Sequence, residues 1–157
     1  FNKAIKNLFI VLFSTLLISA CSTAKKANVD TANDVYTGTD TVEFLAKGVP
    51  DRVFFATNKS KLTTASRDTL RKQATWMRKN KDVTVTVEGH ADERGTREYN
   101  LALGERRANA AKDYLMTYGV SGKRISVISY GKERPVNPAS SPLAWSQNRR
   151  SVTVKAN

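Results

Sequence analysis

One acid and one arginine stand out in the stretch from residue 85 to residue 108. Asp92 lies in a polar turn after a predicted strand, and Arg107 follows fifteen residues later in a predicted helix. A carboxylate accepts an ammonium group, and a guanidinium group binds a carboxylate through its planar fork. The two residues could form a simple salt bridge. If they are held apart, they could instead bind a small ligand that carries both an amino group and a carboxylate.

The helical spacing places further side chains beside Arg107. Asn100, Leu103 and Arg107 are separated by three and four residues, so they share one face of the helix. Thr96 is suited to cap the beginning of this helix. Because the turn with Asp92 is short, the strand and the helix must pack side by side. The pattern predicts that Asp92 approaches the helix face that carries Arg107.

The chain from residue 51 onward alternates between predicted strands and helices. We expect strands at residues 52–56, 82–88, 124–130 and 151–155, and helices at residues 65–80, 97–118 and 143–147. Leu70, Ala74 and Met77 recur at helical spacing and should face a core, and Val152 and Val154 should point inward from the last strand. The order predicts an α+β fold: a β-α-β-α-β sandwich with a mixed four-stranded sheet and helices packed on one face.

The N-terminal residues look like an export signal. Residues 1–20 combine a basic start with an apolar run that is shorter than the about 20 residues of a spanning helix. The single cysteine, Cys21, completes the sequence LISAC, which is similar to a bacterial lipobox. The lipobox implies cleavage before Cys21, acylation of that residue and, with Ser22 rather than Asp next, an outer-membrane location. An ordinary signal peptide with a chance cysteine is the alternative.

Composition divides the remaining chain into a tether and a domain. Residues 21–48 are rich in small and polar types and predict a lipidated flexible tether, and residues 49–157 form the domain. The formal charge is +12, or +10 after loss of Lys3 and Lys6 with the signal. This charge fits either a solvated basic surface or a polyanionic neighbour such as an acidic wall polymer. The export signal and the absence of nucleic-acid motifs argue against nucleic acid.

Two segments carry a family resemblance. GHADERG at residues 89–95 and EYNLALGERRA at residues 98–108 strongly resemble the OmpA-like peptidoglycan-binding domain family. The similarity extends over about residues 53–154. It implies noncovalent binding of the peptidoglycan stem peptide at meso-diaminopimelate, whose free end is a zwitterion. Together with the lipobox, it implies a periplasmic domain that links the outer membrane to the cell wall.

The resemblance also implies roles for individual residues. By position, Asp92 would hold the ammonium group and Arg107 the carboxylate. The residues that would line or support the pocket are Phe55, Asn58, Ala91, Arg94, Asn100 and Leu103. Relatives commonly have Phe-Asp where this chain has Thr57-Asn58, so the first loop lacks a negative charge. The pair Arg149-Arg150 also fits the family, with either an electrostatic or a structural role.

The implied partners are peptidoglycan and the periplasmic Tol assembly, chiefly TolB. TolB would contact residues 88–94 and the following helix, overlap the peptidoglycan site and serve envelope integrity and cell division. We expect no enzyme activity, cofactor or metal, because the chain has one histidine and no zinc-ligand spacing. The alternatives are a wall-anchoring member of the family that is not coupled to Tol, and a hydrolase that uses Asp92 and Glu93.

Overall fold

The computed structural model describes residues 28–156, so the predicted export signal and Cys21 lie outside the described residues. Its main sheet has four strands in the order β5-β8-β6-β7. The strands are β5 (Arg52–Phe54), β6 (Val85–His90), β7 (Ile125–Gly131) and β8 (Arg150–Lys155). β6 and β7 are parallel, whereas β8 is antiparallel to both β5 and β6. The predicted mixed four-stranded sheet is therefore confirmed.

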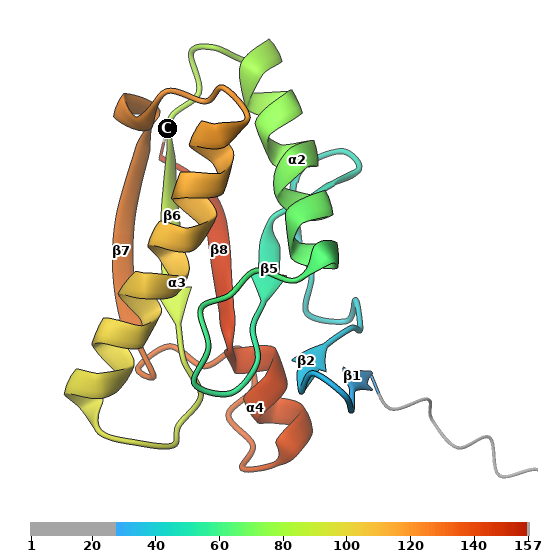
Figure 1. Ribbon diagram of the computed structural model, residues 1–157, viewed down its shortest axis with the longest axis vertical. Helices are drawn as coiled ribbons and strands as arrows, with labels where there is room; N and C mark the ends of the chain where they lie inside the picture. The colour runs from blue at the N-terminus through green and yellow to red at the C-terminus, as the bar shows by residue number, and fades with distance from the viewer. Residues whose placement is uncertain (1–27, 157) are drawn as a thin grey trace, which may run out of the picture.

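Two long helices cover one face of this sheet (Figure 1). The helices are α2 (Thr64–Lys79), α3 (Arg97–Thr117) and the short α4 (Pro142–Asn148), with a 3-10 turn, η1 (Gly122–Arg124). The hydroxyl groups of Thr63 and Thr96 accept hydrogen bonds from the backbone N–H groups of Ser66 and Tyr99, so both caps form. The arrangement confirms the predicted α+β sandwich with helices on one face.

The hydrophobic core lies between the sheet and the two long helices. Leu70 and Met77 from α2 are buried as expected, against Val85 and Val87 from β6 and Leu115 from α3. No helix among residues 28–156 is both long enough and apolar enough to span a membrane. The two layers thus form the scaffold on which the loops at one sheet edge are held.

Strand β6 continues past its predicted end at residue 88. Gly89 pairs with Ser129 of β7 and Ser151 of β8, so it extends the strand instead of terminating it. A methyl group at Gly89 would lie 1.8 Å from the backbone oxygen of Gly104 in α3. Glycine is needed here because helix and strand backbones come into contact. The predicted end of this strand at residue 88 is therefore wrong.

The inward face of β8 also differs from the prediction. Val154 is 39% exposed, whereas the hydroxyl group of Thr153 donates a hydrogen bond of 2.8 Å to Gln73 of α2. Successive side chains of a strand point to opposite faces, so Thr153 faces the helices and Val154 faces away. The polar pair satisfies its own hydrogen bonds inside the protein, which allows threonine to take the position expected for valine.

The segment predicted as a flexible tether is partly folded. Within residues 28–48, β1 (Val29–Asp30) pairs with β2 (Val35–Tyr36), and β3 (Phe44–Ala46) pairs with β4 (Val49–Pro50). Tyr36 is only 3% exposed, and its ring centroid lies 4.8 Å from that of Phe54. The expected tether boundary at residue 48 is therefore wrong, because a few apolar residues anchor this segment to the domain.

Candidate functional site

The predicted site residues come together at one edge of the sheet. β5 and β6 run in the same direction because each is antiparallel to β8. The loop after β5, the turn after β6 and the beginning of β8 therefore meet at this edge, beside α4 (Figure 1). Helix α3 begins here as well, and it carries Arg107 about two helical turns after Asn100. Three stretches of chain that are distant in sequence thus surround one position.

Asp92 is enclosed by two arginines. Its carboxylate accepts hydrogen bonds of 3.0 and 2.7 Å from the Nε and Nη2 of Arg94, and of 3.3 Å from Nη1 of Arg149. The side chain is only 8% exposed. Burial opposes ionisation, but the bonds from Arg94 and Arg149 outweigh it and hold the pKa of Asp92 below its ordinary value. Asp92 is therefore a buried anion at neutral pH.

Arg107 is fully buried and bound to backbone oxygens. Its Nε, Nη1 and Nη2 donate to the carbonyl groups of Lys59, His90 and Ala56 at 2.9, 2.8 and 3.0 Å. A guanidinium group has five N–H bonds, so two remain beyond these three. The centre of the guanidinium group also lies 5.3 Å from the ring centroid of Phe55. Arg107 thus ties the loop after β5 to the end of β6.

The surroundings of Arg107 weaken its basicity without removing its charge. Burial lowers its pKa to about 9, and the nearby charge of Arg149 acts in the same direction, whereas Asp92 opposes the shift. Arg107 remains a cation at neutral pH. Among the hydrogen bonds and ion pairs of the described residues, none joins Asp92 to Arg107 directly. The two charges are held apart, which is the arrangement that a zwitterionic ligand requires.

The remaining predicted residues divide into a buried layer and an exposed mouth. Phe55, Ala91, Asn100 and Leu103 are buried beneath the charged groups. Asn100 donates a hydrogen bond of 2.9 Å to the carbonyl group of Arg94 and so fixes the turn after β6. Their burial means that these four residues shape the site mainly from below.

Asn58 and Arg94 form the mouth. Asn58 is exposed and has a φ of 55°, a left-handed conformation that asparagine tolerates well. Arg94 is exposed in part, and its guanidinium carbon lies 4.2 Å from the ring centroid of Trp145 in α4. The first loop therefore offers an exposed amide, and not a carboxylate, at Asn58.

Sequence reasoning left Arg149 without an assigned place in the site and missed Asp34. Arg149 is buried and bonds Asp92, and its Nη2 also donates to the backbone oxygen of Asp34 at 2.6 Å. The family-like pair at residues 149 and 150 was a signal for Arg149. No signal pointed to Asp34, because its segment was expected to be a tether, and only the folded hairpin brings it here.

The two adjacent acids of the turn have different surroundings. Asp92 points to the arginines, whereas Glu93 is exposed, accepts a 2.7 Å hydrogen bond from the indole N–H of Trp145 and also contacts Ser140. The described part of the chain contains no cluster of three or more His, Cys, Asp or Glu side chains suited to a metal. The two acids thus bond to different partners, whereas a glycoside hydrolase places both of its carboxylates at one bond.

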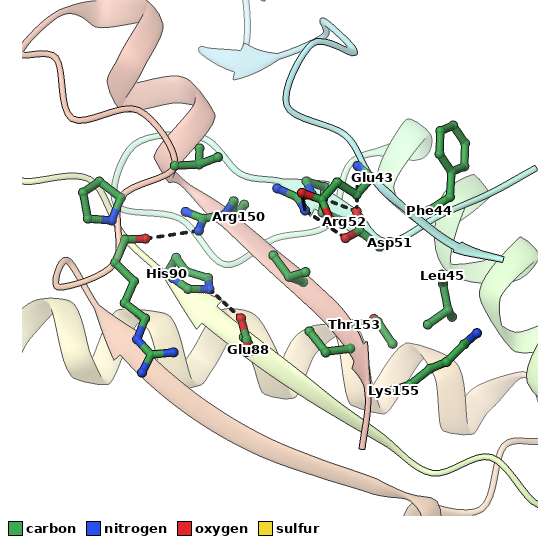
Figure 2. Close-up of a pocket in the computed structure, with 15 residues that line it drawn as sticks. Glu43, Phe44, Leu45, Asp51, Arg52, Glu88, His90, Arg150, Thr153 and Lys155 are labelled. Atoms are coloured by element: carbon green, nitrogen blue, oxygen red, sulfur yellow. Dashed lines mark hydrogen bonds and ion pairs between the residues drawn. The ribbon is translucent and has the colours of Figure 1, made fainter. Parts of the chain in front are cut away.

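A hollow lies on the sheet face away from the helices (Figure 2). It has a volume of about 570 Å³ and is crossed by a 3.3 Å contact between His90 and Glu88. Burial lowers the pKa of His90 to about 3, and the positive charges of Arg150, Arg52 and Arg134 contribute. His90 contributes to both places: it lines this hollow, and its carbonyl group accepts a hydrogen bond from Arg107 at the candidate site.

Comparison with known proteins identifies the family. A sequence model of the OmpA family matches residues 54–149, which is more than half of the chain. The chain belongs to the OmpA family. The matched OmpA segment contains every predicted site residue except the lipidation site Cys21, whereas Asp34 lies outside it.

Sequence similarity to individual proteins extends beyond the matched OmpA segment. The peptidoglycan-associated lipoprotein of Brucella melitensis biotype 1 is 44% identical over 150 residues, which cover 92% of this chain and 89% of the relative. The protein of the same name from Rhizobium meliloti is 46% identical over 149 residues, which cover 92% and 85%. The crystal structure of the peptidoglycan-associated lipoprotein from Burkholderia pseudomallei has a TM-score of 0.65 and 33% identity, over 67% of this chain and 89% of that one. The fold is thus that of an OmpA-family domain.

Proposed function

We propose that this protein is an outer-membrane lipoprotein that binds peptidoglycan noncovalently and links the outer membrane to the cell wall. The observation that carries the proposal is the separation of Asp92 and Arg107, two charged and buried groups at one sheet edge. The names of the most similar relatives support the same substrate. The ligand would be the diaminopimelate residue of the stem peptide, whose free end carries one ammonium group and one carboxylate.

The geometry suggests how recognition proceeds. The ligand's ammonium group would bind Asp92 and compete there with Arg94, the more exposed of its two arginine partners. The ligand's carboxylate would bind Arg107. Because Arg107 has no exposed surface, the loop carrying Ala56 and Lys59 must move and yield its hydrogen bonds to the carboxylate. Binding thus exchanges internal bonds for ligand bonds, and no covalent chemistry is needed.

The membrane side of the proposal depends on Cys21. Acyl chains on this residue would hold the protein at the outer membrane, and the domain would face the periplasm. The first described residue, Asn28, lies seven positions after Cys21. An extended chain spans at most about 3.6 Å per residue, so the domain would stay within about 25 Å of its anchor. The wall and the membrane would then be held close together.

The protein would also serve the Tol assembly. TolB would contact the turn after β6 and the exposed face of α3, so that TolB and peptidoglycan exclude each other. This coupling would connect wall attachment to envelope integrity and cell division. Simultaneous saturation of the domain by TolB and a stem peptide, measured by calorimetry, would contradict exclusion.

Sedimentation with purified sacculi tests the wall site. We expect Asp92→Asn and Arg107→Lys to lose most binding, because each changes one charged end of the clamp. Glu105→Gln is the matched control, since it removes an exposed acid from the same helix as Arg107. Binding is measured at 50 mM and 300 mM NaCl, because salt removes nonspecific attraction between a basic protein and acidic polymers. Equal sedimentation of both clamp variants and wild type at high salt would contradict the site.

Metabolic labelling with palmitate tests the anchor separately. Wild-type protein should incorporate label and fractionate with the outer membrane. Cys21→Ser should lose both properties, since the sulfur is the acceptor of the diacylglyceryl group. Retained label in Cys21→Ser would show that the cysteine is not the lipidated residue.

A further inference from the structure

The turn of the N-terminal hairpin brings a second carboxylate to the mouth of the site. Asp34, between β1 and β2, has a φ of 54° and is 52% exposed at its side chain. Its Oδ1 lies 3.1 Å from Nη2 of Arg149, and its Oδ2 accepts a hydrogen bond from the hydroxyl group of Thr57. Both partners belong to the edge that holds Asp92. The hairpin is therefore directly bonded to the candidate site.

These contacts close a ring around the site. From Asp34, the ring passes through Thr57 to Arg94, then to Asp92 and Arg149, and back to Asp34. Two carboxylates and two guanidinium groups make the ring neutral overall. A zwitterionic ligand that binds beside such a ring adds no net charge to the site, because its ammonium group and its carboxylate cancel.

The two carboxylates of the ring differ in accessibility. Asp92 is buried, and its oxygens are engaged by Arg94 and Arg149. Asp34 is half exposed, and one side-chain partner is present at each of its oxygens. An ionised carboxylate has about four acceptor positions, so Asp34 retains capacity for another donor. An incoming ammonium group therefore meets an accessible acceptor at Asp34 before it reaches Asp92.

We propose that Asp34 is a further ligand-binding residue, which binds the ammonium group of the wall peptide together with Asp92. This inference rests on the proposed peptidoglycan function and adds a residue outside the matched OmpA segment of residues 54–149. The acid replaces the negative charge that Asn58 does not provide in the first loop. The N-terminal hairpin thus belongs to the binding site and is not only a spacer between anchor and domain.

The test uses two soluble peptides with the mature chain. One is a stem peptide that ends in meso-diaminopimelate, and the other is the same peptide with its free amine acetylated. Calorimetry gives the Kd of each for wild type, Asp34→Asn and Asp30→Asn. Asp30 is the matched control, because it lies in the same hairpin and its carboxylate bonds only to Ala32 and Asn33.

We expect Asp34→Asn to weaken binding of the free-amine peptide about tenfold, as loss of one charge-assisted hydrogen bond at a half-exposed position would do. Asp30→Asn should bind like wild type. The acetylated peptide should bind wild type and Asp34→Asn equally, since it has no ammonium group for Asp34. Asp34→Glu, which keeps the charge, should preserve the preference for the free amine.

Four results would overturn the inference. Equal affinity of wild type and Asp34→Asn for the free-amine peptide would exclude a contact. Equal weakening for both peptides, with a lowered melting temperature, would assign Asp34 a structural role in the hairpin. If wild type bound neither peptide, the proposed function itself would fail, and the inference would fail with it. Loss in Asp92→Asn with none in Asp34→Asn would keep the proposed function and reject only the added residue.

Discussion

Arg107 and Arg149 have almost no exposed surface, yet each carries a charge beneath the site. Arg107 donates to three backbone oxygens, and Arg149 donates to the carbonyl groups of Phe55 and Asp34 as well as to Asp92. A buried cation is tolerated only where hydrogen bonds satisfy its donors. These arginines therefore hold the loops together in addition to any role in ligand binding.

This double role gives a stability prediction for Arg107. We expect Arg107→Ala to lower the free energy of unfolding by about 3–5 kcal/mol, because one buried and two partly buried carbonyl groups lose their hydrogen-bond partner. Urea denaturation measures the change. Arg106→Ala is the control, as its side chain is exposed and should change stability by less than about 0.5 kcal/mol. Similar stability of the two variants would show that the carbonyl contacts of Arg107 are dispensable.

His90 predicts a dependence of stability on pH. Burial lowers its folded pKa to about 3, so the folded protein keeps it neutral while the unfolded chain takes up a proton below about pH 6.5. The contribution of neutral His90 to stability is fully present above about pH 6.5, and it is lost as the pH falls from there toward the folded pKa of about 3. Between pH 6.5 and 5, the loss should be about 2 kcal/mol by urea denaturation.

The variant His90→Gln isolates this effect, because the chain contains one histidine. Its free energy of unfolding should change little between pH 6.5 and 5, a range above the ordinary titration of carboxylates. A variant that lost as much stability as wild type would assign the pH dependence to other groups.

At the level of the elements, α3 and β6 are in contact along their backbones. A methyl group added at Gly104 would lie 2.4 Å from the hydroxyl oxygen of Ser129 and 2.9 Å from the backbone oxygen of Gly89. Glycine in a helix interior costs about 1 kcal/mol relative to alanine. The close contact compensates for this cost, because it brings Arg107 within hydrogen-bond distance of the His90 carbonyl group at the end of β6. The α3–β6 contact therefore sets the distance between Arg107 and the end of β6.

The substitution Gly104→Ala tests this contact. On propensity alone it should stabilise the helix, but we expect a net loss of about 2 kcal/mol, because overpacking at a backbone contact forces the helix outward. Ala102→Gly on the exposed face of α3 is the reciprocal control, with an expected loss of about 1 kcal/mol from propensity. Denaturant midpoints measure both. A stabilised Gly104→Ala would contradict the close approach.

The elements also show where sequence patterns were sufficient. The alternating valines of β6 and the Thr96 cap of α3 predicted these elements because period and capping chemistry are local properties. The face of β8 was predicted wrongly, since Thr153 and Val154 are both good strand residues. Only the facing Gln73 on α2 decides which of them points inward. Local sequence cannot contain that information.

For the whole molecule, the N-terminal segment completes the domain. Val35 and Tyr36 are buried against Phe54, the last residue of β5. Burying two such side chains contributes about 3–5 kcal/mol, which is a large share of a small domain's stability. The segment also carries Asp34 to the site edge. Folding of the hairpin and completion of the site are thereby linked.

Truncation tests whether the hairpin is part of the folded unit. A protein that begins at residue 49 should unfold at lower denaturant concentration than one that begins at residue 28. Its free energy of unfolding should be lower by about 3 kcal/mol or more. Tyr36→Ala in the longer protein should cause a loss of similar size, since it removes the contact with Phe54. Equal stability of the two lengths would restore the boundary at residue 48.

The sequence by itself determined the layers, the helix that carries Arg107 and the turn that carries Asp92. These features follow from local periodicity, capping and a motif that occupies one continuous stretch of chain. Only the tertiary structure decided that Asp92 pairs with Arg149 and Arg94 instead of Arg107, and that Asp34 joins them. The physical reason is that the ion pairs of Arg149 join side chains that only folding brings together, 57 positions apart for Asp92 and 115 for Asp34.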